Sequence, residues 1–129
     1  MSTFDFGVDI EACRENLRRR EQRRYQERES LRQAAREAIT HAIREVLPRY
    51  PDVQQGYLFG SVTMDGHFSS HSDIDVAVEG TNIEQYFSLW HELDDALPAW
   101  FIDLRDISTP SHFADTVRQT GELIYDRRK

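Results

Sequence analysis

The segment from Ile10 to Leu47 most constrains the fold, because it contains no Gly or Pro and is rich in good helix formers. Pro48 and the pair Tyr50-Pro51 end this run, since proline cannot donate a backbone hydrogen bond and restricts the residue before it. The sequence predicts one long helix, or two helices with a soft break near residues 23–25. Apolar residues recur every three or four positions in its second half, a pattern that packs on a sheet: Leu31, Ala35, Ala38, Ile39, Ala42, Val46 and Leu47.

The first half of this helix carries few apolar residues and many arginines. Only Ile10, Cys13, Leu17 and Tyr25 are available as anchors, so we expect much of it to project from the domain. Between residues 14 and 36 the chain has nine Arg and four Glu, several at the spacing of helical ion pairs. This composition favours a solvated or protein-docking helix over one that contacts RNA, so we expect no direct nucleic-acid binding.

After Pro51 the pattern changes to short strands that alternate with helices. We expect strands at 56–59, 73–78 and 100–107 and an edge strand at 123–125. Residues 63–72 are expected to form a polar loop with room for one helical turn. Thr81 or Asn82 caps a helix that runs to Leu97, and Ser111 caps a last helix that Gly121 closes. The prediction is a single α/β (α+β) domain over residues 1–129, with a small mixed β-sheet flanked by helices. Residues 1–47 form the Arg-rich helix and residues 52–129 the core.

Charge is divided unevenly along the chain, whose formal net charge is −7. Residues 51–129 hold 14 acids against 5 Arg or Lys, whereas residues 1–50 hold 11 Arg against 9 acids. An acidic half repels nucleotide phosphates unless divalent cations neutralise it. The division therefore favours a metal site in the second half.

Cysteine content and hydropathy indicate the compartment. Cys13 is the only cysteine, which excludes an internal disulfide and a cysteine-built zinc site. No stretch approaches the roughly 18 apolar residues of a membrane helix, and Met1–Phe6 lacks the features of a secretory signal. We expect a cytoplasmic protein that makes no contact with a membrane.

Three aspartates lie on strands where they can share one face of the sheet. Asp73 and Asp75 point to the same side of their strand, about 7 Å apart at ~3.3 Å per residue, while Ile74 points into the core. Asp103 occupies the polar face of the next predicted strand and joins them if the two strands pair. A bare carboxylate inside an apolar strand is costly, so an all-oxygen Mg²⁺ site is favoured over a purely structural role.

The turn Gly60-Ser61 follows the first predicted strand. Backbone N–H groups and a hydroxyl at such a turn can bind phosphates. Ser61 could alternatively be a hydrolase nucleophile, but the Gly-x-Ser-x-Gly motif is absent. The phosphate-binding interpretation is therefore preferred.

Leu58-Phe59-Gly60-Ser61, Ser72-Asp73-Ile74-Asp75-Val76 and Phe101-Ile102-Asp103-Leu104, in this order, resemble the signature of the DNA polymerase beta nucleotidyltransferase superfamily. The size resembles the minimal nucleotidyltransferases found beside HEPN-domain ribonuclease toxins. The resemblance covers roughly residues 35–126. It implies that Gly60 and Ser61 hold the β- and γ-phosphates, and that Asp73 and Asp75 bind Mg²⁺. It also implies that Asp103 completes the metal site and helps deprotonate the attacking hydroxyl.

The loop departs from the family pattern in two ways: the gap from Ser61 to Asp73 is one residue longer than usual, and Met64 and Asp65 stand where an Arg is frequent. The resemblance implies an Mg²⁺-dependent antitoxin that transfers AMP from ATP to a tyrosine hydroxyl of a partner HEPN toxin. One alternative is a catalytically weak module that neutralises its partner by stoichiometric occlusion. Another is a stand-alone transferase for small molecules, which would need self-association to form an acceptor cleft, so both homo- and hetero-oligomers remain open.

Overall fold

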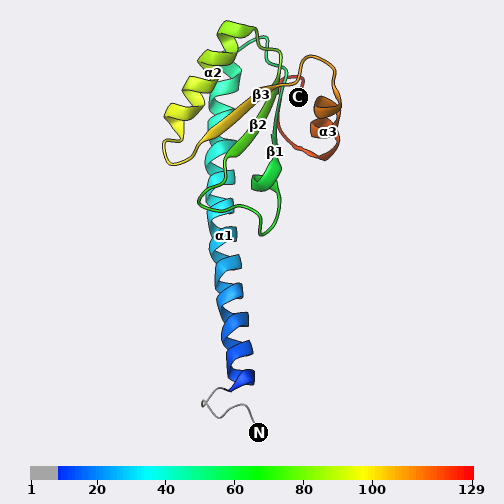
Figure 1. The fold of residues 1–129 in the computed structure, drawn as a ribbon. Helices are drawn as coiled ribbons and strands as arrows, with labels where there is room; N and C mark the ends of the chain where they lie inside the picture. The colour runs from blue at the N-terminus through cyan, green and yellow to red at the C-terminus, as the bar shows by residue number, and fades with distance from the viewer. Residues whose placement is uncertain (1–8) are drawn as a thin grey trace.

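The computed structural model describes residues 9–129 and has one long helix against a small sheet (Figure 1). The segment Met1–Phe6, for which we expected no secretory signal, lies outside the described residues. In chain order the elements are α1 (Ile10–Val46), η2 (Leu47–Arg49), β1 (Gln55–Phe59), η3 (Gly60–Thr63), β2 (Ile74–Glu79), α2 (Ile83–Ala96), β3 (Ile102–Asp106), α3 (His112–Thr120) and β4 (Glu122–Asp126).

Helix α1 is continuous over 37 residues, so the alternative of a break near residues 23–25 is wrong. The Asp9 carboxylate caps it by accepting a hydrogen bond from the Ala12 amide (3.2 Å). Its N-terminal arm, defined here as residues 10–24, projects away from the sheet as predicted (Figure 1). The arm is about 22 Å long at the rise per residue of an α-helix. Its own backbone hydrogen bonds, together with ion pairs such as Glu15–Arg18 (2.8 Å), hold it as a helix. Within residues 9–129 no helix is both long and apolar enough to cross a membrane.

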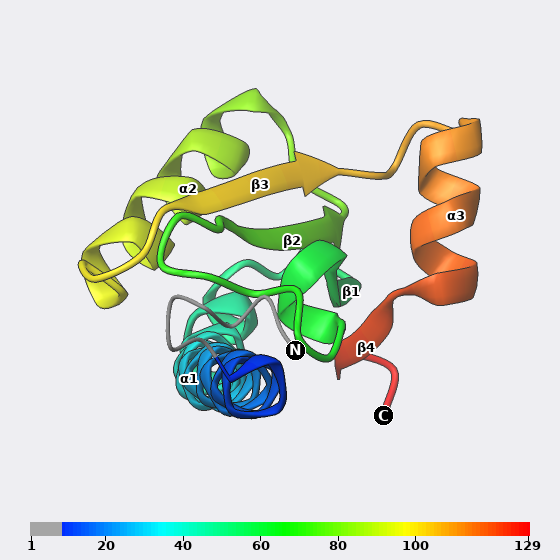
Figure 2. The ribbon, with the colours of Figure 1, turned by 60° about the horizontal axis from the view of Figure 1, so that its bottom comes forward.

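The sheet is mixed, as the sequence predicts, with strand order β3-β2-β1-β4 (Figure 2). β1 pairs antiparallel with both β2 and β4, whereas β2 and β3 run parallel and are joined by α2. A parallel pair needs a crossover connection, and Asn82 and Gln85 start the crossover helix with a reciprocal capping box. The expected edge strand therefore exists, and it lies next to β1.

Some element boundaries differ from prediction. β2 begins at Ile74, so Asp73 lies just before the strand, and β3 is confined to Ile102–Asp106. The helical turn of the loop begins directly at Gly60 and ends at Thr63, earlier than the predicted 63–72. Phe68, within that polar stretch, is fully buried and anchors the loop to the core.

The core lies on two sides of the sheet. In the larger part, Ile39 and Ile43 of α1 and Leu89 and Leu93 of α2 pack against even-numbered residues of the strands. These strand residues are Leu58, Ile74, Val76, Val78, Ile102 and Leu104. On the opposite face α3 packs Ala114 and Val117 on Tyr57 and Ala77. The inward direction predicted for Ile74 is thus confirmed. The odd-numbered residues of β2 and β3 face away from α1.

The outer edge of β3 is protected by side chains of α2. The Trp90 indole N–H donates to the Ile102 carbonyl (2.8 Å), and the Tyr86 hydroxyl donates to the Leu104 carbonyl. Unpaired carbonyls on an edge strand otherwise invite pairing with another chain. These two aromatic residues therefore close an edge that lies beside the aspartates.

The contrast between the packed and projecting parts can be tested with two leucines. Leu58 is fully buried, whereas Leu17 is 58% exposed on the arm. We expect Leu58→Ala to lower the free energy of unfolding by about 2–5 kcal/mol through lost burial and a residual cavity. Leu17→Ala should change it by less than about 0.5 kcal/mol in urea denaturation. Equal losses for both variants would mean that the arm packs on something in solution.

Candidate active site

Two of the predicted aspartates lie side by side on neighbouring strands. In the parallel register of β2 and β3, Asp75 stands opposite Asp103. Both belong to the odd-numbered residues, on the face turned away from α1, and Asp73 immediately precedes β2. The expected pairing of the strands is therefore confirmed, and it brings the carboxylates onto one face of the sheet.

The environment of Asp75 disfavours its charge. Burial, followed by the negative charges of Asp103 and Asp73, raises the pKa of Asp75 from 3.8 to about 6. Arg105 opposes this shift, but its guanidinium Nε lies on Asp103 Oδ1 (3.2 Å) rather than on Asp75. Asp103, and not Asp75, is thus the carboxylate that Arg105 pairs with directly.

Gly60 lies directly against the Asp75 carboxylate. Its φ of +72° is in the left-handed region that favours glycine, and a Cβ there would lie 2.2 Å from Asp75 Oδ2. Both the conformation and the space therefore require glycine. The η3 turn that starts at Gly60 is fixed by the Thr63 hydroxyl, which donates to the Gly60 carbonyl (2.7 Å), and Ser61 is half-buried in this turn.

The donor set fits a hard divalent cation in its chemistry. Asp73, Asp75 and Asp103 offer only oxygen ligands, and the raised pKa of Asp75 reflects its burial and then the neighbouring negative charges, which a cation would offset. Across residues 9–129, however, no three acidic, His or Cys side chains already converge on one point. Asp103 is turned toward Arg105 instead. The metal and phosphate roles of Asp73, Asp75, Asp103, Gly60 and Ser61 remain predictions.

Arg105 and Phe113 lie near the carboxylates, although no role for them was predicted from the sequence. The Arg105 guanidinium lies 5.7 Å from the centre of the Phe113 ring, and Phe113 meets Phe59 edge-on (5.5 Å). Strand periodicity places Arg105 on the same face as Asp103, which was a usable signal. Nothing in the sequence indicates that Phe113, on a distant helix, reaches this face.

Asp106, the last residue of β3, has a structural role. It accepts hydrogen bonds from the Ser108 amide (2.7 Å) and the Thr81 amide (3.1 Å). Burial raises its pKa, but hydrogen bonds from Ser108 and Thr81 outweigh that effect and leave the pKa below its ordinary value. Asp106 therefore holds the connections after β2 and β3.

A glycine turn facing carboxylates on two parallel strands is suited to enzymes that transfer phosphate-bearing groups with the help of divalent cations. Residues 41–129 match the family model described as polymerase beta, nucleotidyltransferase, and the chain belongs to that family. No curated protein is similar enough to the chain to count as a match.

Several solved structures share the fold. A crystal structure of a toxin–antitoxin with AMP-PNP is similar at 26% identity and a TM-score of 0.57, over 69% of this chain and 74% of that one. A tri-AMPylated Shewanella oneidensis HEPN toxin in complex with MNT antitoxin is similar at 25% identity and a TM-score of 0.52, over 72% and 73%. A mutant of the toxin–antitoxin MntA-HpeT gives 27% identity and a TM-score of 0.51, over 68% and 69%.

The charge on Asp75 should make stability depend on pH. Because its pKa is raised from 3.8 to about 6, ionising Asp75 opposes folding fully above pH 6 and not at all below about pH 4. We expect Asp75→Asn to stabilise the protein by about 1–2 kcal/mol at pH 7.5 in a chelator, after allowing for solvent screening. The gain, measured by thermal unfolding, should vanish as the pH falls to 4.

Magnesium provides the control for this measurement. If the carboxylates bind it, adding Mg²⁺ raises the melting temperature of the unmodified protein more than that of Asp75→Asn. A variant less stable than the parent at pH 7.5 in chelator would contradict the assigned electrostatics.

Proposed function

We propose that this chain is a minimal nucleotidyltransferase that moves AMP from ATP to a hydroxyl group on a partner protein. The observation that carries the proposal is the register of β2 and β3, which sets Asp75 opposite Asp103 with Gly60 packed on the Asp75 carboxylate. Membership of the polymerase beta nucleotidyltransferase family supports the reaction class. The similar toxin–antitoxin crystallised with AMP-PNP supports an adenine nucleotide as substrate.

Each residue of the site would have a separate task. The backbone of Gly60 and the Ser61 hydroxyl would bind the β- and γ-phosphates, and Asp73, Asp75 and Asp103 would hold Mg²⁺. Bound Mg²⁺ would neutralise the triphosphate and the departing pyrophosphate.

The transfer itself is an in-line displacement. The acceptor oxygen forms a bond to the α-phosphorus as the bond from that phosphorus to its bridging oxygen breaks, and pyrophosphate leaves. The proton of the acceptor hydroxyl passes to Asp103, which lies nearer to solvent than the even-numbered core residues of its strand.

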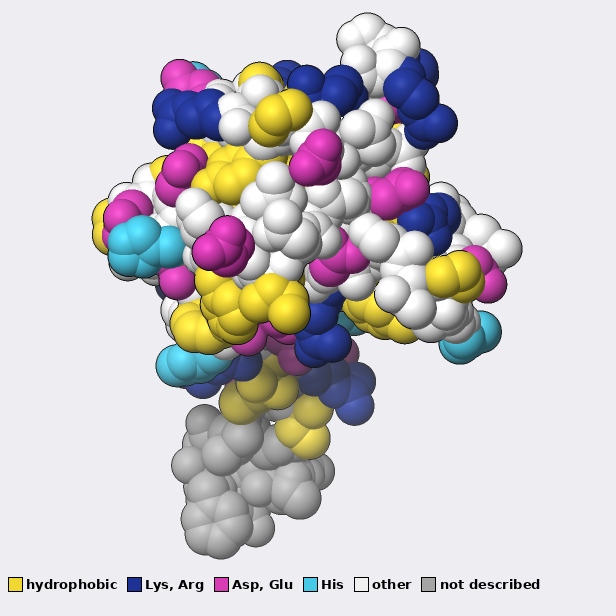
Figure 3. Space-filling model, turned by 90° about the horizontal axis from the view of Figure 1, so that it is seen from above, with side chains coloured by type: hydrophobic (Ala, Val, Ile, Leu, Met, Phe, Trp, Pro, Cys, Tyr) yellow, Lys and Arg dark blue, Asp and Glu magenta, His cyan; other side chains and the backbone are white. Residues whose placement is uncertain are grey.

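A protein acceptor suits the surroundings of the carboxylates. Figure 1 shows the face of β2 and β3 turned away from α1 toward the viewer, and α3 is the helix that packs on this side of the sheet. Phe101 just before β3 is 59% exposed and Phe113 is 40% exposed, and large exposed apolar side chains near a site mark interaction surfaces. From above, hydrophobic side chains gather in patches between acidic and basic ones (Figure 3).

The proposed partner is a HEPN-type toxin, with a tyrosine hydroxyl as acceptor, and the pair would act in the cytoplasm. The similar complex of a tri-AMPylated HEPN toxin with an MNT antitoxin supports this assignment. The added AMP would bring charge and bulk to the toxin, so this chain would act as an antitoxin by modifying its partner.

Intact-mass spectrometry tests the proposal directly. The product of the neighbouring gene, incubated with this protein, ATP and Mg²⁺, should gain the mass of one or more AMP units. The double variant Asp73→Ala/Asp75→Ala should lower the rate by at least about a hundredfold, because nothing else described on this face replaces two carboxylate ligands. The matched control Asp94→Ala/Asp95→Ala removes two exposed acids of α2 and should retain the full rate.

Two results would count against a protein adenylyltransferase. Transfer that survives in the Asp73/Asp75 double variant would show that the assigned carboxylates are not the site. Absence of any mass gain, together with a stable complex of the two proteins, would favour neutralisation by stoichiometric occlusion.

A further inference from the structure

We propose that Glu29 and Arg32 of α1 are positioning residues that hold the segment 60–66, here called the nucleotide loop, in its binding conformation. The proposal rests on the proposed function, because it assigns these residues a part in nucleotide binding. The nucleotide loop contains η3 and ends at Gly66, and it contacts both α1 and β2.

Arg32 contacts the nucleotide loop at two points. Its Nη2 donates to the Asp65 carboxylate (2.8 Å), and its Nη1 donates to the Val62 carbonyl (3.3 Å). The same guanidinium is held on α1 by both oxygens of Glu29, each 2.9 Å away. Arg32 is 13% exposed and Glu29 17%, so their mutual ion pair is shielded from solvent more than a surface pair, whereas the Asp65 carboxylate is 75% exposed.

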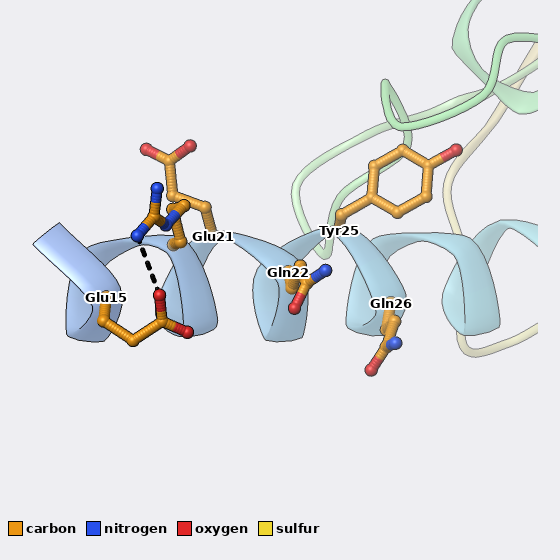
Figure 4. Close-up of a pocket in the computed structure, with 6 residues that line it drawn as sticks. Glu15, Glu21, Gln22, Tyr25 and Gln26 are labelled. Atoms are coloured by element: carbon orange, nitrogen blue, oxygen red, sulfur yellow. Dashed lines mark hydrogen bonds and ion pairs between the residues drawn. The ribbon is translucent and has the colours of Figure 1, made fainter.

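Glu29 and two neighbouring side chains hold the far end of the loop. Glu29 Oε2 accepts the Gly66 amide (2.8 Å), and Arg28 Nε donates to the Gly66 carbonyl (2.8 Å). The hydrogen bond from Arg32, then that from Gly66, lower the pKa of Glu29 to about 2, so it stays ionised at neutral pH. Tyr25 leans from the helix toward this loop (Figure 4), and a Cβ on Gly66 would lie 2.8 Å from its ring.

These contacts supply what the nucleotide loop lacks in its own sequence. Residues 60–66 contain no Arg or Lys, and Asp65 adds negative charge near the expected phosphate site. Arg32 offsets that charge from a position 33 residues earlier in the chain. The positive charge that contacts the nucleotide loop therefore comes from α1.

The expected effect follows from conformational selection. A ligand that binds only the ordered loop has an apparent dissociation constant equal to the intrinsic one divided by the ordered fraction. Gly60 and Gly66 both adopt positive φ, so the loop has conformational freedom to lose. If releasing Arg32 lowers the ordered fraction to about a tenth, nucleotide binding weakens about tenfold.

Hydrogen exchange and calorimetry on the full chain test this role. For Arg32→Gln we expect faster exchange of the amides of residues 62–66 and an apparent Kd for Mg-ATP raised about tenfold. The rate of transfer at saturating ATP should stay within about twofold, because the carboxylates are untouched. Arg32→Lys should restore part of the affinity, because lysine keeps the positive charge. The restoration should be incomplete, because an ammonium group cannot make both paired contacts of the guanidinium.

Two further variants keep the test decisive. Arg28→Gln removes a single contact to Gly66 and should give a smaller change in the same direction, even if Arg32→Gln folds poorly. Arg19→Gln breaks an exposed pair with Glu15 on the arm and should leave both exchange and affinity unchanged.

The outcomes separate the two proposals. Unchanged hydrogen exchange of residues 62–66 in Arg32→Gln overturns the positioning role. This holds even if the variant binds ATP more weakly, because the weaker binding would then come from a lost direct contact between Arg32 and the nucleotide. Effects of Arg19→Gln as large as those of Arg32→Gln also overturn it. If the unmodified protein binds no ATP, the proposed function fails, and the exchange data alone decide whether α1 holds the loop.

Discussion

The parallel pairing of β2 with β3 sets Asp75 directly beside Asp103 on the same face of the sheet. The rest of the fold compensates for the repulsion between these two carboxylates. Like charges directly opposite each other destabilise a sheet. The other face of the same strands buries Ile74, Val76, Ile102 and Leu104 against α1 and α2, and each fully buried side chain of this kind contributes about 1.5–3 kcal/mol. The hydrophobic side of the sheet thus offsets the repulsion on its polar side.

The repulsion is distributed unequally. Asp103 has Arg105 as a counter-charge, and Arg105 rests in turn on the Phe113 ring, so α3 takes part in the charge balance of the site. Asp75 is instead wedged against Gly60, where a Cβ would collide with its carboxylate. A bound cation would therefore reduce the electrostatic repulsion on Asp75 more than that on Asp103. It would bind at the point where the glycine turn meets the carboxylates of the two strands.

Local sequence patterns predicted those features of this structure that depend only on residues close together in the sequence. The alternation that sends Ile74 inward and Asp75 outward, and the caps Asn82 and Ser111, follow from short-range rules and are confirmed. The burial of Phe68 inside a polar stretch did not follow, because no periodicity distinguishes it from its neighbours. The long-range contacts of Arg32 were equally invisible: the helix pattern shows which face is apolar, but not which loop approaches the polar one.

The position of Glu29 and Arg32 divides α1 into three parts with different roles. The arm, residues 10–24, makes none of these contacts with the sheet domain. Polar side chains of residues 25–32 hold the nucleotide loop, and apolar side chains from Leu31 onward pack on the sheet. A truncation that removes residues 1–30 would therefore delete Glu29 and Arg28 together with the arm, and would disturb the loop and any docking surface at once. Only a cut before Tyr25 removes the Arg-rich arm alone, so that loss of partner binding can be distinguished from loss of nucleotide binding.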